Sequence, residues 1–156
     1  PPIPIGHPEM PVVVLPTPES TWHGDLEWGG KHANNNWVTH WTSTDDYLHW
    51  DIDVVRAGTY EMTLMYTCPE ENLGVRVCVE ADGARVEGVI EKAHDPEPVP
   101  SPDRVPRQEV YEKVWAPLTL GRLELDEGAA RLYVKALEIP GDAAMDLKAV
   151  RVGRVD

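Results

Sequence analysis

The clearest pattern in the sequence is an alternation of apolar and polar residues that begins near residue 47. Trp50, Ile52 and Val54 fall on one side of an extended chain, and the histidine and aspartates beside them fall on the other. A glycine at position 58 then favours a tight turn. Because alternation over this length is typical of a half-buried strand, residues 47–55 are predicted to form one.

The same alternation returns along the rest of the chain, interrupted by turn signals. Residues 59–68 and 75–81 are predicted to form a hairpin, and Asp82-Gly83 is a two-residue turn signal that predicts a strand after it. No segment shows sustained helical spacing. The remaining expected strands cover residues 84–91, 111–125, 131–137 and 145–152.

Short strands separated by turns predict an all-β fold, an antiparallel β-sandwich of the jelly-roll kind. Residues 1–20 contain seven of the 15 prolines, and we expect them to form an extended arm whose residues 12–15 add a strand at a sheet edge. Residues 93–106 contain five prolines and are predicted to be a long loop. The domain organisation is therefore an arm, 1–20, and a single sandwich domain, 21–156.

The composition narrows the classes of partner. The 156 residues carry a formal charge of -13, which argues against nucleic acid or an anionic membrane surface as the main partner. No apolar run approaches the roughly 20 residues that a membrane helix needs. The chain opens on four residues, Pro1-Pro2-Ile3-Pro4, without an initiator methionine or a signal segment, so we expect it to be a mature fragment or a piece of a longer protein.

The two cysteines fall on opposite sides of their expected strands. Cys68 continues the apolar set of its strand, whereas Cys78 shares a side with Arg76 and Glu80. Side chains on opposite faces do not bridge easily, so two free thiols are expected.

The most distinctive chemistry is a concentration of tryptophans and planar polar side chains in residues 22–46. Indole faces are suited to stack on a sugar ring, and histidine and asparagine side chains both donate and accept hydrogen bonds. Because the chain contains no phenylalanine, packing in the core is the simpler role for many of these rings. The candidate stacking platforms are Trp22, Trp28, Trp37 and Trp41, and the candidate hydroxyl partners are His23, Lys31, His32, Asn34, Asn35, Asn36 and His40.

The charge of this stretch favours a neutral sugar, because Lys31 is its only fixed positive charge. A sulfated or uronic ligand would need help from Lys92, Arg104 or Arg107, which flank or lie in the long loop.

Catalytic and metal-binding signals are weak. No serine-nucleophile elbow, phosphate-binding glycine loop or zinc-protease histidine pair is present. Asp45-Asp46 with His40 and His49 is the best acid–base constellation, but adjacent carboxylates at a strand entrance are usually turn residues. Structural calcium suits a sandwich rim, although exposed loop acids explain the same residues. The carboxylates considered for calcium are Asp25, Glu27, Asp45, Asp142 and Asp146.

Short motifs spread over nearly the whole chain carry a family resemblance. They are the opening Pro-Pro-Ile-Pro-Ile-Gly-His-Pro-Glu, Gly30-Lys31-His32 with Trp37 and Trp41, Trp50-Asp51, Tyr66-x-Cys68-Pro69, the proline-rich loop at 100–107, and Met145-Asp146-Leu147-Lys148. In these motifs the chain resembles the β-sandwich module C-terminal to the catalytic domain of some bacterial arylsulfatases. More distantly it is similar to galactose-binding-like and carbohydrate-binding modules.

This resemblance implies an accessory domain of a secreted or periplasmic glycan-processing protein, with a sulfatase as the expected parent. Sulfatase catalysis is not implied for this chain, because neither Cys68 nor Cys78 begins the Cys-x-Pro-Ser-Arg type of signature that those enzymes need.

The leading functional hypothesis is therefore a non-catalytic carbohydrate-binding module. The alternative is a structural domain that packs on its catalytic neighbour or forms a dimer, using the arm and the loop around Arg104. A free-standing hydrolase or lyase built on Asp45, Asp46 and the histidines is the third hypothesis.

Overall fold

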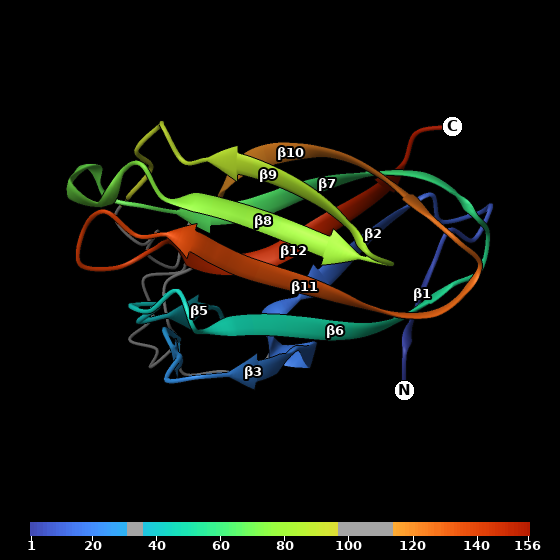
Figure 1. Ribbon diagram of the computed structural model, residues 1–156, viewed down its shortest axis with the longest axis horizontal. Helices are drawn as coiled ribbons and strands as arrows, with labels where there is room; N and C mark the ends of the chain where they lie inside the picture. Colours follow the sequence, from blue (N-terminus) through green and yellow to red (C-terminus); the bar gives the residue numbers. More distant parts are fainter. Residues whose placement is uncertain (31–35, 97–113) are drawn as a thin grey trace, which may run out of the picture.

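The chain folds into two β-sheets that pack face to face, with their long strands running along the longest axis of the molecule (Figure 1). The computed structural model describes residues 1–30, 36–96 and 114–156. Over these ranges there is no α-helix, only two one-turn 3-10 helices, η1 (Thr17–Glu19) and η3 (Glu70–Asn72). No helix in the same ranges is long and apolar enough to cross a bilayer.

The first sheet has the order β1-β6-β11-β8-β9, and β3 also pairs with β6. Its neighbours are antiparallel except β1 and β6, which are parallel. The strands are β1 (Ile3–Ile5), β3 (Thr21–His23), β6 (Tyr47–Val54), β8 (Arg76–Ala81), β9 (Ala84–Val89) and β11 (Gly128–Glu138).

The second sheet has the order β10-β7-β12-β5-β4, and β2 also pairs with β12. All of these pairs are antiparallel. The strands are β2 (Val12–Pro16), β4 (Glu27–Trp28), β5 (Val38–Thr39), β7 (Gly58–Thr67), β10 (Ala116–Leu125) and β12 (Asp146–Arg154).

The predicted all-β antiparallel sandwich is confirmed, and the seven strands expected after residue 47 all form. Of the strand expected over 111–125, residues 116–125 form β10, residues 114 and 115 precede it without strand structure, and residues 111–113 lie outside the described residues. The strand expected over 12–15 is β2. The arm also adds β1, which the sequence pattern did not predict, and it buries Ile5 and Leu15 in the core.

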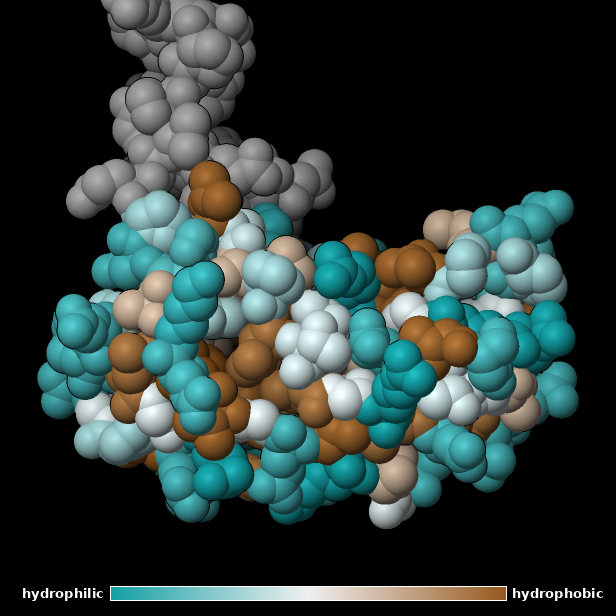
Figure 2. All heavy atoms as spheres, turned by 90° about the horizontal axis from the view of Figure 1, so that it is seen from above, coloured by the Kyte–Doolittle hydropathy of each residue, from teal (hydrophilic) through white to brown (hydrophobic). Residues whose placement is uncertain are grey.

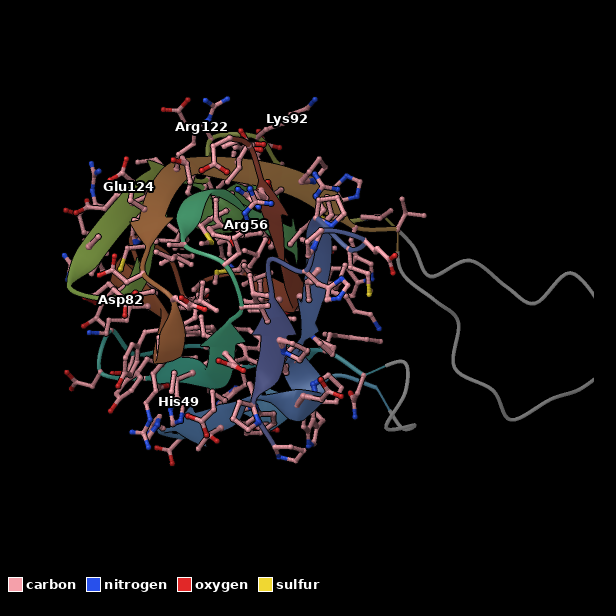
Figure 3. The ribbon with its side chains drawn as sticks, turned by 90° about the vertical axis from the view of Figure 1, so that its right-hand side faces the viewer. His49, Arg56, Asp82, Lys92, Arg122 and Glu124 are labelled. Carbon is pink, nitrogen blue, oxygen red and sulfur yellow. The ribbon has the colours of Figure 1, made fainter. Side chains whose placement is uncertain are left out.

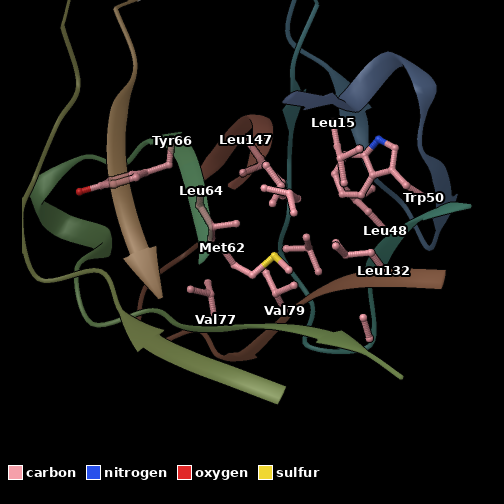
Figure 4. Close-up of a cluster of buried hydrophobic side chains, with 14 of the residues drawn as sticks. Leu15, Leu48, Trp50, Met62, Leu64, Tyr66, Val77, Val79, Leu132 and Leu147 are labelled. Atoms are coloured by element: carbon pink, nitrogen blue, oxygen red, sulfur yellow. The ribbon is translucent and has the colours of Figure 1, made fainter. Parts of the chain in front are cut away.

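Alternation of side chains fills the space between the sheets. The inward residues of β6 and β11, including Trp50 and Leu132, meet those of β7, including Met62 and Leu64, and all four side chains are fully buried (Figure 4). The indole N–H of Trp50 donates a 2.8 Å hydrogen bond to the carbonyl of Pro16, so its one polar atom is satisfied. The core thus takes its aromatic volume from tryptophan and tyrosine.

One edge of the sandwich is closed where β9 of the first sheet runs beside β10 of the second. Partly buried side chains such as Val86, Leu118 and Leu120 pack on the core there. Seen from that edge, apolar side chains form a band between polar ones (Figure 2). The Leu120 side chain packs directly on Gly88, since a Cβ at that position would lie 2.7 Å from Leu120 Cδ2.

Both cysteines are buried. Neither forms a disulfide, as the strand pattern predicted. Cys68 lies in the hydrophobic core, whereas Cys78 lies opposite Lys135 and Glu87 in the cross-strand register, on the outer face of the first sheet. The expected outward position of Cys78 is correct, but its neighbours cover it completely. Burial raises the pKa of each thiol to about 11.

These thiols are therefore predicted to resist labelling in the folded protein. A rise of this size lowers the thiolate fraction at neutral pH about a hundredfold, and the thiolate is the reacting species. Ellman's reagent should label neither cysteine in native buffer and both in concentrated guanidinium. Prompt labelling of either thiol in native buffer would contradict the burial described here.

Candidate functional site

Two of the predicted platform tryptophans meet at the sandwich edge away from β9 and β10. Trp22 belongs to β3, at an edge of the first sheet, and Trp28 belongs to β4, at an edge of the second. Their ring centroids are 4.2 Å apart with the planes tilted by 53°. Trp22 is partly buried against the core, and Trp28 keeps 42% of its surface exposed. Trp28 is therefore the most open of the four predicted platforms.

The structure corrects the prediction for Trp37 and Trp41. Trp41 is fully buried and Trp37 is 6% exposed, so neither ring has a free face on which a sugar could stack. Trp37 packs edge-on to Trp115 at 5.6 Å, and its indole lies directly over the backbone of Gly29. In a chain without phenylalanine these two indoles serve as interior packing.

The predicted hydroxyl partners that the structure describes do not lie together in one site. The side-chain oxygen of Asn36 is buried and accepts hydrogen bonds from the backbone N–H of Gly30 at 2.7 Å and of Trp37 at 3.0 Å, which corrects its predicted role as a hydroxyl partner. His40 is exposed and pairs with Glu27 at 3.5 Å. Lys31, His32, Asn34 and Asn35 lie outside the described residues.

His23 points to the outer face of the first sheet, and there it joins an aromatic group that sequence reasoning missed. Its ring stacks on Tyr47 with centroids 4.2 Å apart and planes 13° from parallel. Tyr133 lies 6.0 Å from Tyr47 and 5.6 Å from His49, measured between ring centroids. Strands β3, β6 and β11 thus bring four rings together, and Figure 3 shows His49 at the lower side of the sandwich beside β3 and β6.

Charged side chains border these rings. The ammonium of Lys135 lies 5.7 Å from the Tyr47 ring centroid and 5.5 Å from that of Tyr133, and 2.7 Å from a carboxylate oxygen of Glu80. Burial raises the pKa of Glu80, but hydrogen bonds from Lys135 and Arg85 outweigh burial, so the net shift is downward. Glu80 is therefore ionised at neutral pH and holds Lys135 beside the two tyrosines.

At the other side of the group, Asp51 accepts a 3.2 Å hydrogen bond from the guanidinium of Arg131 and lies 3.7 Å from Nε2 of His49. His49 is 5% exposed, and its Nδ1 lies 2.8 Å from Nε2 of His23. Burial lowers the pKa of His49, Arg131 and His23 lower it further, and Asp51 opposes them. His49 is therefore neutral at physiological pH.

The aromatic face of the first sheet, defined by His23, Tyr47, His49, Tyr133 and Lys135, adjoins a hollow of about 630 Å³. The hollow lies at the edge of β6 and is lined by Pro1, Pro2, Ile3, Pro4, Glu19, Thr21 and Asp51. A flat ligand on the rings has room to extend toward Asp51.

A second hollow of about 430 Å³ lies on the second sheet near the turn after β7. Glu27, His40 and Asp146 line it, and Asp146 accepts a 2.7 Å hydrogen bond from the Thr39 hydroxyl. Among its described lining residues the one ring is the imidazole of His40, so the hollow has no tyrosine or tryptophan on which a sugar could stack.

The weak catalytic and metal signals of the sequence do not assemble. Asp46 lies against the backbone N–H of Asp25 at 3.4 Å, while His40 and His49 contact Glu27 and His23 instead. Within the described ranges no group of three or more histidine, cysteine, aspartate or glutamate residues is placed to hold a metal ion, so the carboxylates considered for calcium form no such site there.

The sequence matches no protein-family model and no curated protein. Solved structures do match. A family 35 carbohydrate-binding module from Clostridium thermocellum has a TM-score of 0.59 at 12% identity, with 92% of this chain and 98% of that one covered. The module CBM6cm-2 of Cellvibrio mixtus lichenase 5A, in complex with cellotriose, has a TM-score of 0.62 at 11% identity, with 94% and 100% covered.

The same fold also occurs as part of a larger enzyme. The Podospora anserina GH26-CBM35 β-(1,4)-mannanase matches with a TM-score of 0.61 at 11% identity over 93% of this chain. This chain spans 28% of that enzyme. At such identities the likeness establishes the fold, which is the β-sandwich shared with carbohydrate-binding modules.

The packing of Trp37 on Gly29 is testable. A Cβ at position 29 would lie 1.9 Å from the indole nitrogen of Trp37, so Gly29→Ala should displace the ring and lower the free energy of unfolding by about 1–3 kcal/mol. Gly153→Ala is the matched control, because its Cβ would meet only Val12 at 3.6 Å. Chemical denaturation measures both, and equal stability of the two variants would refute an interior role for Trp37.

Proposed function

We propose that this chain is a non-catalytic carbohydrate-binding accessory module whose ligand lies on the aromatic face of the first sheet. The observation that carries this proposal is the convergence of the Tyr47, Tyr133 and His23 rings with the Lys135–Glu80 and Arg131–Asp51 pairs on one outer surface. The similarity in fold to carbohydrate-binding modules supports it.

The chemistry of this face suits a pyranose ring. The aromatic rings offer apolar surface to the C–H side of the sugar, and the ionised pairs offer donors and acceptors to its hydroxyl groups. Because Tyr47 and Tyr133 are both partly exposed on adjacent strands, a single ligand can contact both. The rings are held by neighbouring side chains on rigid strands, so little ordering entropy is lost on binding.

The charge of the face favours a neutral oligosaccharide. Lys135, Arg131 and Arg85 each pair with a carboxylate at 3.2 Å or less. An anionic ligand would have to displace those carboxylates within a chain of net charge -13. Neutral ligands such as cellotriose and β-1,3-galactotriose, which accompany structures of similar fold, are therefore suitable probes.

The site assignment is tested by alanine variants of the two tyrosines. Tyr47→Ala and Tyr133→Ala should each weaken binding of a neutral oligosaccharide about tenfold or more, as loss of a central aromatic contact does at binding sites. Isothermal titration against cellotriose, β-1,3-galactotriose and a sulfated counterpart measures this, with the sulfated sugar expected to bind most weakly.

Val14→Ala, an exposed change on β2 of the second sheet, is the matched control and should leave affinity unchanged. Trp28→Ala distinguishes the rival position at the sandwich edge. If Trp28→Ala abolishes binding while both tyrosine variants bind normally, the ligand lies on the tryptophan pair and this assignment is wrong.

We further propose that the parent protein is a glycan-processing enzyme that is secreted or periplasmic. The support is the match to part of a larger mannanase and, for a sulfatase parent in particular, the sequence motifs alone. Sequencing the complete reading frame tests both points, because it shows whether a catalytic domain and an export signal accompany this chain, and a frame with neither would contradict them.

A specific observation also favours the structural alternative. Met10 is 60% exposed, and Val12 and Val14 of β2 are 50% and 54% exposed, so the arm presents apolar side chains to solvent. Clusters of exposed apolar side chains mark interaction surfaces. Under this alternative the arm contacts a second copy or the parent catalytic domain.

The dimer form of this alternative predicts self-association that Val14→Glu abolishes, because a buried unpaired charge is costly. Thr44→Glu, at an exposed loop position, should leave it intact. Sedimentation velocity over a wide concentration range measures both. A wild-type protein that stays monomeric throughout removes the dimer form.

A further inference from the structure

The contact between His23 and His49 limits how many protons the two rings can carry. Nε2 of His23 and Nδ1 of His49 are 2.8 Å apart, which is hydrogen-bond distance. A hydrogen bond between two imidazole nitrogens needs one N–H and one lone pair, so at least one ring must be neutral. Two imidazolium rings would place N–H against N–H, and the contact would break.

The groups that face this histidine pair come from three strands. Strand β6 contributes Tyr47 and Asp51, and β11 contributes Arg131, Tyr133 and Lys135. Strand β8, next to β11, contributes Glu80.

These surroundings oppose a second positive charge. Glu80 is paired with Lys135, and Asp51 is shared between His49 and the guanidinium of Arg131. His49 is 5% exposed, so water screens little of the repulsion. Burial and Arg131 also lower the pKa of His49.

The pair matters to the proposed ligand site because His23 stacks on Tyr47, 13° from parallel with centroids 4.2 Å apart. His23 sits on β3, a three-residue edge strand, and its hydrogen bond to the buried His49 fixes the imidazole against the tyrosine. Without that bond, His23 regains rotamers that leave Tyr47 unsupported. The ligand would then have to order both rings on binding.

We propose that His49 is a positioning residue of the carbohydrate site, which holds His23 on Tyr47 through their hydrogen bond. The hydrogen bond lasts only while at least one of the two imidazole rings is neutral. Ligand affinity therefore falls in mildly acid solution. This inference rests on the proposed function. It adds a regulatory property, in which a neutral sugar is bound near neutral pH and released on acidification although the sugar itself does not titrate.

The experiment measures affinity for the neutral oligosaccharide that binds best, by isothermal titration from about pH 7.5 to about pH 5, the range in which histidine changes charge. Wild-type affinity should fall about tenfold across this range. His49→Gln removes the imidazole that holds His23, so its affinity should be lower than wild type at neutral pH. Because glutamine cannot take up a proton, the affinity of this variant should also be flat with pH. His7→Gln, an exposed histidine of the arm, is the matched control and should keep the wild-type profile.

A ligand-independent readout accompanies the titration. Nitrogen-15 NMR of the imidazoles should show that the hydrogen bond between Nε2 of His23 and Nδ1 of His49 is present near neutral pH and is lost toward about pH 5. If His49→Gln does not fold, His23→Gln replaces it, because the same hydrogen bond is lost and the affinity should again be flat with pH.

The outcomes separate the two proposals. If no neutral oligosaccharide binds at any pH, the proposed function fails and this inference fails with it. If an oligosaccharide binds but wild-type affinity is flat with pH, or the hydrogen bond between the two rings persists at about pH 5, only the pairing of His23 and His49 as a switch is overturned. A pH profile retained in His49→Gln overturns it as well.

Discussion

Filling and closing the space between two sheets is the constraint on which the rest of this structure depends. The chain has no phenylalanine, so the buried aromatic volume comes from tryptophan and tyrosine rings. Trp41 and Trp50 are fully buried in the interior. Trp22 and Trp28 close one edge, and β9 against β10 closes the other. Tryptophan abundance near the amino end is thus first a consequence of packing, and one ring, Trp28, retains a substantial open surface among the four predicted platforms.

Because the interior takes most of the indoles, we place the proposed ligand site on the outer face of the first sheet. Its rings are tyrosine and histidine, whose polar atoms tolerate water, and ion pairs between β6, β8 and β11 hold the surrounding side chains. The outer face of the second sheet is different, since exposed valines of β2 lie there beside β12. The two faces therefore differ in chemistry, and the two proposals, for a sugar ligand and for contact with another protein, rest on different faces.

Much of the fold was predictable because strand signals are local. Alternation at Trp50, Ile52 and Val54 identifies β6 and its buried side, and Asp82-Gly83 identifies the turn between β8 and β9. The candidate site was not predictable in the same way. His49 and Asp51 were recognised as outward residues, but Tyr133 belongs to a strand far along the chain, and its place beside His49 depends on the register of β11 with β6. His23 was selected for its chemistry without any indication that Tyr47 was its neighbour.

The sequence by itself determined the all-β class, most strand positions, the free state of both thiols and the acidic charge, because period-two patterning, turn residues and ionisable groups are properties of short segments. Tertiary structure alone decided which tryptophans are interior, that Asn36 is occupied by backbone donors, and that two histidines from β3 and β6 share a hydrogen bond. These outcomes depend on which strands become neighbours and in what register. That choice is made by the burial of the whole core, so no short stretch of sequence contains it.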